Sequence, residues 1–365
     1  MQCVLKTYRS SDNMAYTNID DPSAHFYSYA FSKSSGTGSV TFDANSDLQP
    51  DFLWVKSRTN ADSHELWDST RGVNSTLFSD STSAEDTAAN RIVSFDTDGF
   101  TWGNAGNLNA AGDFVSWAWK ANAGSTSSNT DGSLTSTVQA NTDAGFSIVE
   151  YTTGSVPAGS GGYFSVGHGL GVTPDMVITK RLSGTSGWWS WHQDLSNDTT
   201  SYLTLNTTAA EGNVGDMWGN GMTSSVFGGG AGSHFGSSDY IAYCFAEKQG
   251  FSKFGKYTGN GSSNGPFVYT GFKPSFVVLK RTDAANNWFM YDVKRDGYNE
   301  SQLPHVKANQ VDAEAQTNNT IDILSNGFKI RGGLNGTNGS GGTYIYMTFA
   351  ENPFVTSTGI PTTAR

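Results

Sequence analysis

Clusters of basic residues and long apolar runs are missing from this sequence, and each absence excludes a class of partner. Asp and Glu number 33 against 22 Lys and Arg, so the formal net charge is −11. Because phosphate backbones are bound by clustered Lys and Arg, we expect no nucleic-acid partner. No apolar run reaches the ~18 residues of a membrane-spanning helix, so we expect no membrane span.

Cysteine is also scarce. The chain has two, Cys3 and Cys244, which lie far apart, and Cys244 falls within an apolar stretch. We therefore expect no disulfide framework, and folding in a reducing compartment. Residues 1–6 lack the charged start and the apolar core of a signal peptide, so we expect synthesis in the cytoplasm without export by that route.

The composition favours strands and turns. Charged residues make up only 15% of the 365 positions, whereas aromatic residues reach 13% and glycine occurs 43 times. Aromatic residues prefer strands, and glycine, Ser and Asn prefer turns. At ~100–200 residues per domain, this length corresponds to about two or three domains. We predict an all-β fold with antiparallel sheets.

One pattern occurs three times. A proline leads into a short apolar run that ends in lysine, and an aromatic residue follows at the same distance. Each copy then has Ala-Glu in a polar stretch and closes on an alternating aromatic strand. The recurring residues are Pro50, Lys56, Trp67 and Glu85; Pro174, Lys180, Trp191 and Glu211; and Pro274, Lys280, Tyr291 and Glu314. Such self-similarity is typical of repeated domains.

The repeats predict three tandem antiparallel β-sandwich domains of the jelly-roll or lectin-like kind. Copies 2 and 3 follow each other closely, so we expect these two to pack together and copy 1 to be hinged. A short helix is expected within 81–91. The predicted boundaries are an N-terminal arm at 1–22, copy 1 at 23–121, a Ser/Thr/Asn-rich linker at 122–143, copy 2 at 144–248, copy 3 at 249–353 and a C-terminal tail at 354–365.

No catalytic or metal-binding set stands out. The segment 261–265 has the Gly-x-Ser-x-Gly form of a nucleophile elbow, but a strand-like run follows where a helix is needed. The six histidines lack the spacing of metal ligands, and 96–99 indicates a turn rather than a calcium loop. We predict no catalytic residue, no metal site and no cofactor.

The candidate ligand-binding residues are Trp188, Trp189 and Trp191. Neighbouring strand residues face opposite ways, so three indoles within four positions cannot all enter one core. One hypothesis is that an exposed indole binds a sugar ring or a protein. The other is that Trp189 and Trp191 enter the core while Trp188 covers the sheet edge. Trp288 in the related position of copy 3 favours packing.

The lysine that ends each run, at Lys56, Lys180 and Lys280, recurs in every copy. Recurrence in three units of one fold indicates a structural requirement. The lysine stem would cover apolar surface, or the ammonium group would pair with Asp68, Asp194 or Asp292.

Copy 1 resembles a repeat common in uncharacterised marine bacteriophage proteins, and copies 2 and 3 resemble it more loosely. The resemblance rests on the segments 48–58, 68–73, 83–85, 95–100, 115–120 and 349–354, and on the tail at 361–365. In the looser copies, the Arg-Gly of copy 1 is replaced by Leu195-Ser196 and by Lys294-Arg295.

The resemblance implies a structural protein of the virion, of the tail-fibre or lectin-like kind, with no catalytic residue to transfer. Its expected partners are other virion proteins, a second copy of the chain in a homo-oligomer and a glycan of the host surface. A capsid-decoration or head-fibre protein is the alternative. A glycan-degrading tail depolymerase is a further alternative, but the sequence singles out no pair of carboxylates for hydrolysis.

Overall fold

The computed structural model describes residues 16–154, 162–215, 217–230, 234–295, 299, 303–316 and 320–362. Within them the chain is all-β, as predicted, and consists of several antiparallel sheets. The helical elements are short: η1 (Pro22–Ala24), η2 (Asn107–Asn109) and α1 (Asn335–Asn338).

Each copy builds a large sheet with the same central strand order. In copy 1 the order is β1 (Phe26–Lys33), β8 (Gly112–Trp119), β3 (Phe52–Ser57), β4 (Glu65–Asp68) and β5 (Leu77–Phe78). In copy 3 it is β19 (Ser252–Thr258), β26 (Thr343–Pro353), β21 (Phe272–Arg281), β22 (Trp288–Asp292) and β23 (Val306–Lys307). In copy 2 the sheet is wider and runs β16 (Gly212–Asn213), β15 (Ser201–Thr204), β14 (Trp188–His192), β13 (Met176–Arg181), β18 (Ser238–Phe245), β11 (Phe146–Thr153), β10 (Ser136–Asn141) and β9 (Ser127–Asn129).

A small sheet covers one face of each large sheet. The small sheets are β2 (Gly38–Val40), β7 (Gly99–Trp102) and β6 (Ile92–Asp96) in copy 1; β12 (Tyr163–Gly167) and β17 (Val226–Gly230) in copy 2; and β20 (Phe267–Tyr269), β25 (Gly327–Ile330) and β24 (Ile321–Leu324) in copy 3. Phe100, Phe227 and Phe328 occupy equivalent positions in the small sheets, and each is fully buried in the core of its own copy.

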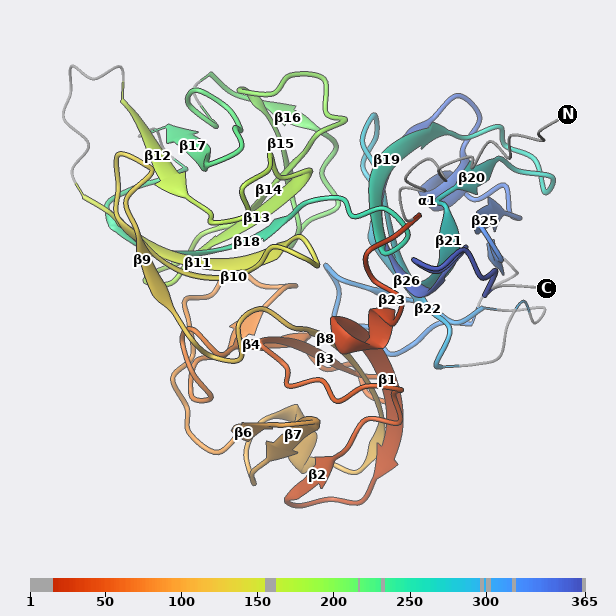
Figure 1. Cartoon of the computed structure of the whole chain (residues 1–365), viewed down its shortest axis with the longest axis horizontal. Helices are drawn as coiled ribbons and strands as arrows, with labels where there is room; N and C mark the ends of the chain where they lie inside the picture. Colours follow the sequence, from red (N-terminus) through yellow and green to blue (C-terminus); the bar gives the residue numbers. More distant parts are fainter. Residues whose placement is uncertain are drawn as a thin grey trace, which may run out of the picture.

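The other faces of the three large sheets meet in one shared core. Figure 1 shows the copies as three lobes around a common centre. The equivalent residues Trp119, Phe245 and Phe349 form a triangle there, with ring centroids 6.3, 5.6 and 6.1 Å apart. The expected hinge at copy 1 is therefore wrong, because its large sheet supplies one side of this core.

The proline-led apolar runs form the central strands β3, β13 and β21, which pair on both sides. Along β3, Phe52 and Trp54 enter the shared core, while Leu53 and Val55 enter the core of copy 1. Side chains alternate between the two faces of a strand, and here both faces are buried. Because both faces of the strand are buried, successive residues are apolar, and the sequence shows a continuous apolar run.

Two local predictions are wrong. The segment 122–143, interpreted as a linker, contributes β9 and β10 to the sheet of copy 2. The segment 81–91 has no helix; it is irregular, with an isolated bridge between Thr76 and Asp86 and a turn at Ala89 and Asn90. There the Glu85 N–H donates to Leu182 O of copy 2 at 2.9 Å, so this backbone contacts a neighbour instead of its own helical turn.

Candidate functional site at the copy interfaces

The tryptophan cluster divides between two cores. Trp188 is fully buried in the shared core, and its Nε1 donates to Phe78 O of copy 1 at 2.8 Å. Trp191 faces the other way into the core of copy 2, where its Nε1 donates to Asp198 O at 3.0 Å. The hypothesis that Trp188 covers a sheet edge is wrong, and neither indole has a surface for a ligand.

Trp189 is the one indole of the three with partial exposure. It lies beside Tyr202 and His234, with ring centroids 5.4 and 4.4 Å away in edge-on geometry. Its ring therefore already packs against other rings and against the core of copy 2, and the structure reduces the predicted three-indole site to a single side chain.

Trp188 occupies a position used for inter-copy contact in all three copies. The equivalent Trp288 donates from Nε1 to Thr204 O of copy 2 at 3.2 Å. In copy 1 the position is His64, whose Nδ1 accepts from Trp54 Nε1 at 2.8 Å. Its Nε2 is therefore the donor to Lys307 O of copy 3, at 3.1 Å.

The three recurrent lysines are buried at the same interfaces. Lys180 Nζ donates to Thr82 O of copy 1, and Lys280 Nζ donates to Thr208 O of copy 2, both at 3.2 Å. Lys56 Nζ closes the ring by donating to Val311 O of copy 3 at 3.2 Å. Each copy is thus tied to the preceding one, and copy 1 to copy 3.

Burial lowers the pKa of each lysine to about 8. Backbone carbonyls, rather than aspartates, surround the ammonium groups: Lys280 also donates to Asn286 O and Lys180 to Ser186 O, both at 2.8 Å. The predicted pairing with Asp68, Asp194 or Asp292 is wrong. Asp194 pairs with Lys256, and the other two bind arginines.

The recurrent Ala-Glu segment is the other half of this interface. The N–H of Glu85 donates to Leu182 O, that of Glu211 to Thr282 O, and that of Glu314 to Arg58 O, at 2.8 to 2.9 Å. Each glutamate backbone therefore docks just beyond the lysine of the next copy. The landmarks that recur in the sequence are the parts that join the copies.

At the interface of copies 1 and 2, a buried arginine links two carboxylates. Arg71 donates to Asp68 at 2.7 Å and to Glu85 at 2.6 Å, and Tyr243 of copy 2 donates its hydroxyl to Asp68 at 2.7 Å. Burial opposes the charge of Arg71, but the carboxylates outweigh it and raise its pKa. Every charge in this network has a partner, as buried charges require.

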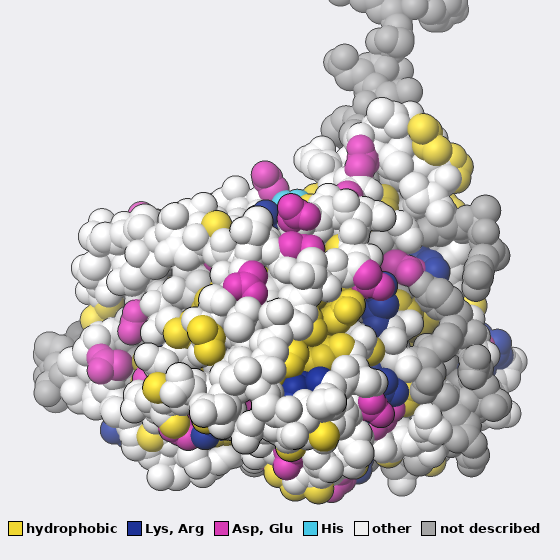
Figure 2. Space-filling view, turned by 90° about the horizontal axis from the view of Figure 1, so that it is seen from below, with side chains coloured by type: hydrophobic (Ala, Val, Ile, Leu, Met, Phe, Trp, Pro, Cys, Tyr) yellow, Lys and Arg dark blue, Asp and Glu magenta, His cyan; other side chains and the backbone are white. Residues whose placement is uncertain are grey.

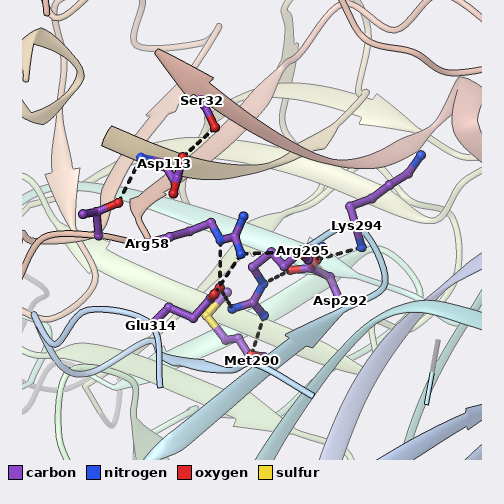
Figure 3. A network of polar contacts seen from close by, with 9 residues as sticks. Ser32, Arg58, Asp113, Met290, Asp292, Lys294, Arg295 and Glu314 are labelled. Atoms are coloured by element: carbon purple, nitrogen blue, oxygen red, sulfur yellow. Dashed lines mark hydrogen bonds and ion pairs between the residues drawn. The ribbon is translucent and has the colours of Figure 1, made fainter. Parts of the chain in front are cut away.

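The interface of copies 3 and 1 repeats the arrangement (Figure 3). Arg295 donates to Asp292 at 2.7 Å and to Glu314 at 3.1 Å, and Trp117 Nε1 of copy 1 donates to Asp292 at 3.1 Å. Figure 3 shows a second arginine, Arg58 of copy 1, approaching Glu314 as well. An open pocket of about 370 Å³ borders this network, lined by Arg58, Thr59, Asp113, Glu314 and Gln316.

Among the described residues, the interface of copies 2 and 3 lacks this network. By strand pairing, His192 takes the position of Asp68 and Asp292. Three residues further on, Leu195 replaces the arginine and packs in the shared core. Met347 replaces Tyr243 and Trp117, and it lines the same narrow apolar gap as His192.

His192 is held neutral. Its Nδ1 accepts from the Asp194 N–H at 3.1 Å, so Nε2 donates to Tyr346 O of copy 3 at 3.2 Å. Burial lowers the pKa of His192 to about 4. At this interface, the neutral residues His192 and Leu195 therefore replace the aspartate and arginine of the other two interfaces.

The described residues contain no group of three His, Cys, Asp or Glu side chains placed to hold a metal ion. Nor does any helix among them have the length and hydrophobicity to cross a bilayer. On the face in Figure 2, carboxylates are scattered, and Lys and Arg lie beside one group of hydrophobic side chains instead of merging into a basic surface. The three buried lysines, in contrast, join neighbouring copies.

A family model for a domain of unknown function, DUF7483, matches residues 21–353. The chain belongs to the DUF7483 family. The match spans all three copies and ends with β26, so it contains every residue of the shared core except Ile19. No curated protein and no solved structure matches the chain.

Proposed function

We propose that this DUF7483 protein is a non-enzymatic structural protein of a bacteriophage virion, exposed on the particle as part of a tail fibre or adhesin that contacts the host. The proposal combines the resemblance of copy 1 to marine phage repeats with one structural observation. The side chains that recur in all copies join the copies around a shared core, as Lys56, Lys180 and Lys280 do. That use fits a rigid framework.

Each copy, on this proposal, is a sandwich of the jelly-roll or lectin-like kind, formed by its large sheet and its small sheet. Closing three such units around one aromatic core buries the inner faces of all three large sheets. The loops and small sheets remain outside, where a virion protein would contact its neighbours, a host glycan or a second copy of itself.

Immunogold labelling of intact phage particles with antibody to this chain tests the proposal. Gold on the tail tip or fibres supports the tail-fibre or adhesin role, whereas gold on the head favours capsid decoration. Particles without gold, from preparations in which the antibody detects the free protein, would contradict a virion role.

The non-enzymatic part has its own test. The purified chain is incubated with polysaccharide from the host, and fragment length is followed by size-exclusion chromatography. We expect the polymer length to stay constant. Shorter fragments would identify a depolymerase and overturn this part of the proposal.

A further inference from the structure

The small sheets differ at one edge. Val40, Val166 and Val268 are equivalent, because each pairs with the buried phenylalanine of its copy. The residues on either side of that valine point away from the core. They are Ser39 and Thr41 in copy 1, Ser165 and Gly167 in copy 2, and Phe267 and Tyr269 in copy 3.

In copy 2 another part of the chain occupies this edge. Leu134 forms a parallel bridge with Val166, and its N–H donates to Ser165 O at 3.0 Å. The Ser136 hydroxyl donates to Gly167 O at 2.8 Å. A Cβ on Gly167 would lie 1.7 Å from Asn129 Oδ1, so the covering segment leaves no space for a side chain. The molecule therefore already uses this edge to bind an extended peptide.

In copy 3 no other described segment pairs with this edge. Phe267 and Tyr269 are 46% and 53% exposed, and they are the two aromatic residues among the exposed large hydrophobic side chains of the described chain. Tyr16 lies at the end of this strand, where its hydroxyl donates to Gly271 O at 2.6 Å and also hydrogen-bonds the side chain of Tyr269. Two exposed rings on one edge strand are an unusual surface for a chain whose other aromatic side chains are mostly buried.

The backbone of this strand is also available. Ile330 N–H donates to Pro266 O at 3.0 Å, so the backbone C=O of Pro266 points towards β25. The backbone groups of successive strand residues point alternately towards and away from the neighbouring strand. Val268 therefore faces β25, and the N–H and C=O groups of Phe267 and Tyr269 face away from it. Among the described residues, no backbone group pairs with these four outward groups.

We propose that β20 is the interaction surface for a second copy of this chain, which adds its own β20 in antiparallel fashion. The strand is self-complementary about Val268. In a two-fold pairing, Phe267 stands opposite Tyr269 of the partner subunit, and the outward backbone groups of the two strands meet as hydrogen-bonded pairs. Each facing ring pair is of the kind that stabilises antiparallel sheets. This inference goes beyond the proposed function and does not depend on it.

The size of the contact predicts its strength. An aromatic side chain buries at most ~150–250 Å², so four half-exposed rings fall well short of the ~1,200 Å² of a stable interface. We therefore expect a weak, reversible dimer that forms at high protein concentration. A surface of this kind associates strongly only where many copies are held side by side.

Sedimentation velocity of the full chain, from ~10 μM to ~1 mM with a reducing agent present, tests the proposal. The unaltered chain should shift from monomer towards dimer across this range. Phe267→Ser with Tyr269→Thr, which installs the residues of copy 1, should remain monomeric. Tyr269→Pro should also remain monomeric, because it removes an outward N–H and leaves the bonds to β25 intact.

The matched control is Val93→Ser, which removes a 49% exposed side chain from copy 1 and should dimerise as the unaltered chain does. All variants should keep the melting temperature of the unaltered chain, since β20 lies outside the shared core. A chain that stays monomeric at the highest concentration overturns the proposal. So does dimerisation that persists in the Phe267→Ser/Tyr269→Thr or the Tyr269→Pro variant.

Discussion

The three interfaces between copies use different residues at equivalent positions. Two of them contain a buried arginine, and among the residues that the structure describes the interface of copies 2 and 3 does not. Where copies 1 and 2 meet, Asp68, Arg71 and Tyr243 form a charged set, and Asp292, Arg295 and Trp117 do the same between copies 3 and 1. Where copies 2 and 3 meet, the equivalent residues are His192, Leu195 and Met347. All three positions have changed together.

The joint change has a physical reason. A buried ion network and a well-packed apolar set of similar volume differ little in stability, but removing one partner leaves a buried charge uncompensated. An arginine without its aspartate, or an aspartate without its arginine, would be costly at any of these interfaces. The three residues are therefore expected to be exchanged together.

The largest effect should come from breaking one charged set. Arg295→Leu leaves Asp292 buried without its cation, and we expect a loss of about 3–5 kcal/mol in the free energy of unfolding, measured by urea denaturation. Adding Asp292→His, which installs the pair of copy 2, should recover part of that loss because Glu314 keeps Arg58. A single variant that costs less than about 1 kcal/mol, or a double variant no better than the single one, would contradict the account.

Acid should weaken the interface of copies 2 and 3 through protonation of His192. The pKa of His192 is lowered from 6.5 to about 4, so the folded chain keeps the ring neutral while the unfolded chain protonates it. The stability from this group is fully present above pH 6.5 and is lost as pH falls towards 4, by about 3 kcal/mol in total. The measurement is the free energy of unfolding between pH 7 and 4.5.

The control for this acid effect is His192→Gln, which has no titrating ring at the same interface. Its stability should fall less steeply than that of the unaltered chain, because the remaining histidines titrate in both proteins. Equal slopes in the two proteins would show that His192 does not titrate as described.

The recurrent lysines should have a moderate effect. Lys280→Met keeps the apolar stem but leaves Thr208 O and Asn286 O without their donor. We expect a loss of about 1–3 kcal/mol in the free energy of unfolding, less than for Arg295→Leu, because burial of the ammonium charge is relieved at the same time. Lys253→Met is the control, since Lys253 forms a partly exposed pair with Glu247 and should cost no more than about 1 kcal/mol.

The smallest effect is expected at Trp189, the partly exposed indole of the tryptophan cluster. Trp189→Ala should cost about 1 kcal/mol, because its ring is already partly exposed, whereas Trp188→Ala should cost about 3–5 kcal/mol through loss of buried area and a cavity. Chemical denaturation of the two variants side by side gives the comparison. Equal costs would contradict the assignment of Trp188 to the shared core.

The sequence predicted the strands better than the contacts between copies. The continuous apolar runs after Pro50, Pro174 and Pro274 indicated buried strands, and they are the central strands of the three large sheets. Recurrence also marked Lys56, Lys180 and Lys280 as structural. What they bind could not be predicted, because Lys56 contacts Val311, 255 residues away along the chain.

Other features were hidden by composition. A Ser/Thr/Asn-rich stretch is typical of a solvated linker, but the same residues suit edge strands such as β9, so 122–143 was misinterpreted. Alanines within 81–91 suggested a helix, whereas that backbone bonds to the next copy. The sequence comparison aligned Arg71-Gly72 with Lys294-Arg295, so it missed that Arg71 and Arg295 are equivalent. Strand pairing shows this equivalence, because it aligns Asp68 with Asp292.

The central claim is that three copies share one core and unfold as one unit. Differential scanning calorimetry tests it most directly, through the ratio of the calorimetric to the van't Hoff enthalpy of unfolding. The account predicts a single transition with a ratio near one, at neutral pH and low protein concentration. Two or three separable transitions, with copy 1 melting independently of the others, would contradict it.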